Sequence, residues 1–163
     1  MKFASLADGA ADRDGRLVVV SRDLRRCVPA GAIAPTLQAA LDDWAAAEPR
    51  LRELATSLEL GSAQGVFDFD PRHVLAPLPR AHHWVDGSAY VNHVELVRKA
   101  RGADMPPSFW TDPLVYQGGS DDLLGAMADV ALPAEEHGID LEAEVAVITD
   151  DVPIGTSANA ARG

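Results

Sequence analysis

The chain has a single cysteine and no long apolar run. Cys27 is the only cysteine among 163 residues, so the chain forms no internal disulfide and offers no cysteine pair to a metal. No apolar run is long enough to span a bilayer. The first eight residues lack the apolar core of a secretion signal. Together these absences predict a protein of the reducing cytoplasm.

Positive charge is also scarce. The chain contains 14 Lys and Arg against 25 Asp and Glu, and its formal net charge is −11 at pH 7. This charge repels the phosphates of nucleic acids and of anionic membranes, so we expect neither as a partner. The hydrophobic content of 47% and the charged content of 24% are typical of globular proteins. The length allows one domain or two small ones.

The N-terminal residues predict a β-hairpin. Residues 2–6 and 16–21 are β-prone, and the second run contains three consecutive valines, which are β-branched. Residues 8–15 between them are rich in Gly and Asp and indicate a turn. The order of strand, turn and strand is that of a hairpin.

Two helices are expected after the hairpin. Apolar residues recur at spacings of four and three from Leu37 to Trp44, which predicts one apolar helix face after Pro35. Pro49 is expected to end this helix or to open the next. Leucines mark the second helix, which should close near Gly61.

A domain boundary is expected at the proline-containing residues 75–80. We predict a small α+β domain of hairpin and helices at residues 1–76, and a second domain at residues 77–163. In the second domain, the expected elements in chain order are a loop, a helix with Ser88 as its N-cap, a short strand and an alternating strand. These elements are predicted at residues 84–88, 89–101, 114–116 and 139–148.

The alternating residues 139–148 carry the strongest chemical signal. In a strand, Asp140, Glu142 and Glu144 would share one face, with neighbours about 6.6 Å apart. Carboxylates this close repel one another unless a cation lies between them, and Mg²⁺ or Ca²⁺ prefers such oxygen ligands. The alternative is a solvated acidic face. The next two positions on that face are apolar, which favours an interior location.

A second feature joins an acid and a histidine. If a helix begins at Ala89, Asp86 lies just before its N-terminus and His93 lies about one turn inside. Histidine is a common general base near neutral pH, and the carboxylate could hold a metal beside it. The alternative is an acid that interacts with the helix dipole and a structural histidine.

In order and spacing, these motifs resemble the fumarylacetoacetate hydrolase family. The resemblance rests on the sequence Asp86-Gly87-Ser88-Ala89-Tyr90-Val91-Asn92-His93, on Pro113-Leu114-Val115-Tyr116 and on Asp140-Leu141-Glu142-Ala143-Glu144. It implies that residues 77–163 begin a mixed β-roll, the catalytic domain. It also implies metal ligands at Asp86, Glu142 and Glu144, a catalytic base at His93, and substrate contacts at Arg101 (aligned with a one-residue gap) and Tyr116.

The resemblance implies an activity as well. A divalent metal (Mg²⁺, Ca²⁺ or Mn²⁺) would assist hydrolysis of a carbon–carbon bond in a small β-diketo acid of the fumarylacetoacetate or acylpyruvate type, as in tyrosine degradation. Intact family members are expected to be homodimers. Decarboxylases and hydratases or isomerases share the metal ligands and stay open as alternatives. Further site residues would follow Gly163, so we expect an incomplete chain, for which a non-catalytic interaction module is another alternative.

Overall fold

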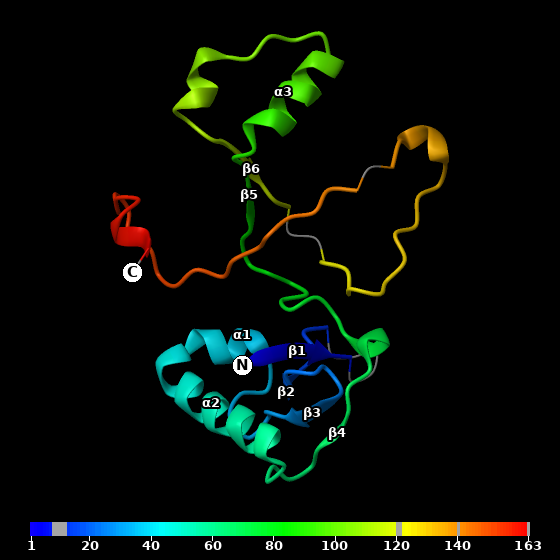
Figure 1. Cartoon of the computed structure of the whole chain (residues 1–163), viewed down its shortest axis with the longest axis vertical. Helices are drawn as coiled ribbons and strands as arrows, with labels where there is room; N and C mark the ends of the chain where they lie inside the picture. The colour runs from blue at the N-terminus through cyan, green and yellow to red at the C-terminus, as the bar shows by residue number, and fades with distance from the viewer. Residues whose placement is uncertain (8–12, 120–121, 140, 163) are drawn as a thin grey trace. The chain divides into compact units, whose positions relative to one another are not determined.

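The structure, a computed structural model, describes residues 1–7, 13–119, 122–139 and 141–162 (Figure 1). It divides into two units, Met1–Asp129 and Val130–Gly163. The boundary predicted between residues 76 and 77 stays a prediction. Within the described part of the chain, no helix combines the length and apolarity needed to cross a membrane.

The first unit begins with the predicted hairpin, which is confirmed. Strands β1 (Lys2–Leu6) and β2 (Arg16–Val20) are antiparallel, with Phe3 opposite Val19. Most of the predicted turn falls on residues 8–12, which lie outside the described residues. Two further antiparallel strands, β3 (Arg26–Pro29) and β4 (Phe67–Asp68), complete a sheet in the order β1-β2-β3-β4.

Both faces of this sheet are apolar, because side chains alternate between the faces and consecutive residues of β2, from Leu17 to Val20, are all apolar. On one face, Leu17, Val19 and Val28 form a core with residues of the helices α1 (Leu37–Asp42) and α2 (Trp44–Leu60). Figure 1 shows both helices along one side of the sheet. The other face forms a second cluster, in which the buried residues are Ala4, Leu6, Val18, Val20 and Cys27, and Phe67, Phe69 and Val74 pack against them.

The start of α1 and the end of α2 lie where the nearby residue types predict them, whereas the interior of α2 does not follow local helix propensity. The Thr36 hydroxyl accepts a hydrogen bond from the amide of Ala39 at 3.1 Å and caps α1. Gly61 ends α2 with φ 75°, a left-handed conformation that suits glycine, as predicted. The prediction for Pro49 was wrong, because this proline lies inside α2. Ala47 and Leu51 are buried on either side of it, and this packing maintains the helix where local propensity would break it.

Burial of Cys27 gives the first testable prediction. The residue lies on β3 with an exposed fraction of 0%, and burial raises the pKa of its thiol to about 11. At pH 8 the native thiolate fraction should therefore be about 100-fold lower than in the unfolded chain. We expect Ellman's reagent to label the native protein at least about 100-fold more slowly than the protein in urea, with the rate rising towards pH 11. Equal rates in both states would contradict this burial.

The rest of the first unit contains a second, two-stranded sheet. Strand β5 (Val85–Ser88) pairs antiparallel with β6 (Leu114–Gln117), and α3 (Val91–Ala100) lies between them in sequence. The helix and the short β6 strand were predicted. The loop predicted at residues 84–88 was wrong for residues 85–88, which form a strand because they pair with residues 114–117. Ser88 is not the helix cap; Tyr90 occupies that position and makes no side-chain capping bond.

Single turns of 3₁₀ helix connect several of these elements, at Pro71–His73, Pro107–Trp110, Glu135–His137 and Ala160–Arg162. The last two belong to the second unit. The strand predicted at residues 139–148 is not present among the described residues, since residues 141–150 are exposed and form neither helix nor strand. Alternation marks which side chains would share a face, but a strand also needs hydrogen bonds to a neighbouring strand. The first unit is a small α+β structure, and the β-roll stays a prediction.

Candidate functional site

One face of α3 borders a hollow in the first unit. His93, Val97 and Arg101 are spaced four residues apart, and this spacing places side chains on the same side of a helix. All three line a pocket with a volume of about 410 Å³. The other residues that line it are Ser88, Val94, Arg98, Ala103 and Leu114. The structure therefore brings two predicted site residues, His93 and Arg101, to one hollow, while their chemical roles stay predictions.

The β5–β6 ladder places the other two predicted residues of this unit beside each other. Asp86 lies opposite Tyr116, and Ser88 lies opposite Leu114. Residues two apart on a strand share a face, so the Asp86–Tyr116 pair lies on the same face of the ladder as the Ser88–Leu114 pair. The two pairs are separated by about 6.6 Å along the strands, and only Ser88 and Leu114 line the hollow. Asp86 is half-buried, whereas its neighbour Val85 on the opposite face is exposed. Asp86 is thus partly withdrawn from solvent near the hollow.

Trp84 packs against Tyr116. The two rings are tilted, with centroids 5.8 Å apart. The indole Nε1 donates a hydrogen bond to the carbonyl of Gly119, and the amide of Gly118 donates to the carbonyl of Trp84, both at 3.0 Å. The ring lies directly over Gly118, where an added Cβ would overlap it. Glycine at position 118 therefore leaves room for the Trp84 ring, which in turn contacts the ring of Tyr116.

Replacing Gly118 by alanine is expected to loosen this end of the ladder. The added methyl group must displace the Trp84 ring, which should lower the stability of the folded state by about 1–3 kcal/mol. Hydrogen exchange at the amides of β5 and β6 should then accelerate by about 10- to 100-fold. Gly87→Ala is the matched control on the same ladder, because a Cβ at that position meets no atom within 4 Å. Equal acceleration in both variants would show that the Trp84 contact does not hold the ladder.

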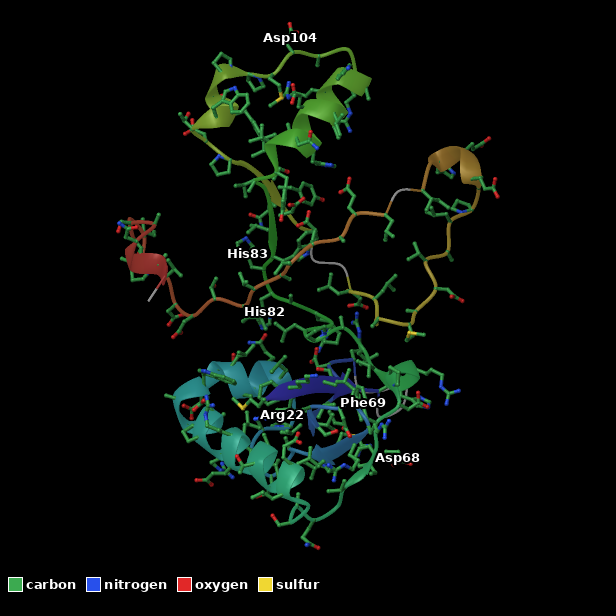
Figure 2. All side chains as sticks on the ribbon, viewed as in Figure 1. Arg22, Asp68, Phe69, His82, His83 and Asp104 are labelled. Atoms are coloured by element: carbon green, nitrogen blue, oxygen red, sulfur yellow. The ribbon has the colours of Figure 1, made fainter. Side chains whose placement is uncertain are left out.

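The chain after α3 folds back on the helix end. The amides of Arg101 and Ala103 both donate to the carbonyl of Arg98, at 3.1 and 2.9 Å. The Nη1 group of Arg98 donates to the carbonyl of Asp104 at 3.0 Å, and Asp104 is labelled in the loop beyond α3 in Figure 2. Arg98 lines the hollow but was not among the site residues predicted from the sequence. Its position, five residues after His93, predicts a direction about 140° away around the helix axis, outside the row of His93, Val97 and Arg101.

His82 and His83, also labelled in Figure 2, are both exposed. Neither lines the hollow beside α3. His82 instead borders a smaller pocket of about 180 Å³ together with Asp14 and Arg80, which form an ion pair. The Arg80 guanidinium lowers the pKa of Asp14 through this hydrogen-bonded contact. The pair attaches the proline-containing segment around residue 79 to the N-terminal hairpin.

Glu142 and Glu144 belong to the second unit, where both are exposed. Asp140 lies outside the described residues. The predicted convergence of Glu142 and Glu144 with Asp86 therefore stays a prediction. Among the described residues, no group of three or more His, Cys, Asp or Glu side chains lies close enough together to hold a metal ion. The donor chemistry of three carboxylates nevertheless suits a hard divalent cation, because such ions prefer oxygen ligands.

Comparisons with known families cover almost the whole chain. Residues 1–80 match the family model described as fumarylacetoacetase N-terminal domain 2. Residues 82–162 match the model described as fumarylacetoacetate (FAA) hydrolase C-terminal. No curated protein gave a significant match.

Proposed function

The chain belongs to the fumarylacetoacetate hydrolase family, and from this premise we propose that it acts as a hydrolase of a carbon–carbon bond in a β-diketo acid of the fumarylacetoacetate or acylpyruvate type. Family membership indicates a hydrolase- or lyase-type function. The observation that supports the finer proposal is the hollow lined by His93 and Arg101, next to the Asp86–Tyr116 pair. A base and a cation thus border space for a small molecule, and a carboxylate lies two residues before the lining residue Ser88 on the same strand.

A divalent metal is part of this proposal, since members of the family generally use one. Asp86, Glu142 and Glu144 would hold Mg²⁺, Ca²⁺ or Mn²⁺ through carboxylate oxygens. When bound, the cation would supply positive charge that polarises the carbonyl oxygens of a diketo acid. This role requires that Glu142 and Glu144 approach Asp86 in the active protein.

His93 is proposed as the general base. An imidazole nitrogen takes a proton from water, and the water oxygen bonds to one carbonyl carbon of the substrate. The bond between that carbon and the adjacent methylene then breaks, and its electron pair forms the enolate of the departing ketone. Return of the proton to the enolate carbon completes the reaction, in which one water and one diketo acid give one carboxylic acid and one keto acid.

Arg101 and Tyr116 are proposed to orient the substrate. The guanidinium of Arg101 can pair with a carboxylate group, and the phenol hydroxyl of Tyr116 can donate to a carbonyl oxygen. Tyr116 is 59% exposed, so more than half of the residue is accessible to a ligand. Trp84 packs against this ring and favours its present orientation.

The direct test follows the absorbance of an acylpyruvate with the protein in Mg²⁺ or Mn²⁺ and again in excess EDTA. We expect turnover with either metal, complete loss in EDTA, and recovery when metal is restored. Loss of CO₂ from oxaloacetate without acylpyruvate cleavage would instead indicate a decarboxylase. Absence of both reactions would favour a non-catalytic interaction module. Sedimentation of the same sample tests the homodimer that we also propose.

A further inference from the structure

The hollow beside α3 has a cationic end and an apolar wall. Arg98 and Arg101 lie at the C-terminal end of the helix, whereas Val94, Val97 and Leu114 line the remaining surface. Val94 is only 6% exposed, so part of this wall is buried. A volume of about 410 Å³ is in the range of small-molecule sites. Such a lining suits a ligand with one anionic group and a short hydrocarbon part.

Arg98 is the fixed member of the arginine pair. Its side chain is half-buried, and its Nη1 group donates to the carbonyl of Asp104 at 3.0 Å. This bond uses one of five N–H donors of the guanidinium, whose planar fork matches the two oxygens of a carboxylate. A side chain that is held before the ligand arrives loses less conformational entropy on binding. Arg98 is therefore better prepared to bind an anion than the exposed Arg101.

The helix dipole offers a different reason for basic residues at this end, since cations stabilise a helix C-terminus. Lys99 distinguishes the two explanations. It lies in the same last turn of α3, but it is exposed and does not line the hollow. Backbone amides of residues 101–103 already donate to the last carbonyls of the helix, so Arg98 is not required to cap them. Its guanidinium bonds to the loop at Asp104 instead.

We propose that Arg98, together with Arg101, binds the carboxylate of a short-chain acid whose hydrocarbon part packs on Val94, Val97 and Leu114. Arg98 lies five residues after His93, about 7.5 Å along the helix axis. Both residues line the same hollow, so an acid held by Arg98 would extend along the apolar wall within the pocket that His93 also borders. The assignment of this acid as the substrate rests on the proposed function, whereas binding of the carboxylate requires no metal.

The test uses the ¹⁵N-labelled protein in EDTA, titrated with butyrate and with its neutral analogue butyramide, while the amide signals of residues 94–103 are followed by NMR. We expect saturable shifts with butyrate, weakening as salt is added, and no saturable shifts with butyramide. Arg98→Gln should raise the Kd for butyrate by about 10- to 100-fold, because it removes a charged hydrogen-bonding partner. Lys99→Gln, which removes the same charge from the same helical turn, should change the Kd by less than about twofold.

Arg98→Lys is a second variant that distinguishes lost binding from misfolding. It keeps the positive charge and removes only the planar arrangement of N–H donors. It should bind butyrate with an intermediate Kd. Equal weakening by the substitutions at 98 and 99 would overturn the proposal, as would equal shifts with butyramide or the absence of any saturable shift. Because no metal is present, carboxylate binding without metal-dependent turnover would reject only the proposed function. Turnover with no effect of Arg98→Gln on either Kd or KM would reject only the role of Arg98.

Discussion

Replacing His93 by alanine is expected to lower kcat for the proposed hydrolysis by about 10²- to 10⁴-fold, the usual effect of losing a general base. Metal affinity should stay within about twofold, because the proposed ligands are carboxylates. The fold should also persist. His93 is exposed on α3, and alanine is the residue most compatible with a helix.

Kinetics and calorimetric titration with Mn²⁺ on the same samples measure both quantities. Asn92→Ala is a suitable control, since Asn92 precedes His93 on the same helix, is exposed and does not line the hollow. It should leave kcat nearly unchanged. If His93→Ala weakened Mn²⁺ binding as strongly as it lowered kcat, His93 would be a metal ligand, and the base would have to be sought elsewhere.

The largest effect on stability is expected from Leu51→Ala. Leu51 lies in the middle of α2 with an exposed fraction of 0% and belongs to the core formed with Leu17, Val19 and Val28 of the sheet. Truncation removes buried methyl groups and leaves a cavity. We expect the free energy of unfolding of this part of the chain to fall by about 2–5 kcal/mol.

Leu60→Ala provides the same chemical change at the end of the same helix. Leu60 is 78% exposed, so its truncation should cost no more than about 0.5 kcal/mol. Urea unfolding followed by circular dichroism at 222 nm would report both variants, because α2 is the longest helix described. Similar unfolding midpoints for Leu51→Ala and Leu60→Ala would mean that α2 does not pack on the sheet as described.

The sequence by itself determined the features that depend on nearby residues. Consecutive β-branched valines separated from β1 by a Gly- and Asp-rich segment predicted the N-terminal hairpin, and Gly61 predicted the end of α2. Both signals act over a few residues, because they depend on backbone preferences at single positions. The ordered spacing of acid, histidine and Glu-x-Glu motif also predicted the family, which the matches to residues 1–80 and 82–162 confirm.

The tertiary structure decided the features that depend on distant partners. Residues 85–88 form a strand only because β6 supplies hydrogen bonds, and Pro49 stays within α2 only because its neighbours pack on the sheet. Arg98 lines the hollow because the loop at Asp104 holds its guanidinium. Local sequence specifies which conformations a segment prefers, but packing and pairing with remote segments contribute comparable free energies and select among those conformations.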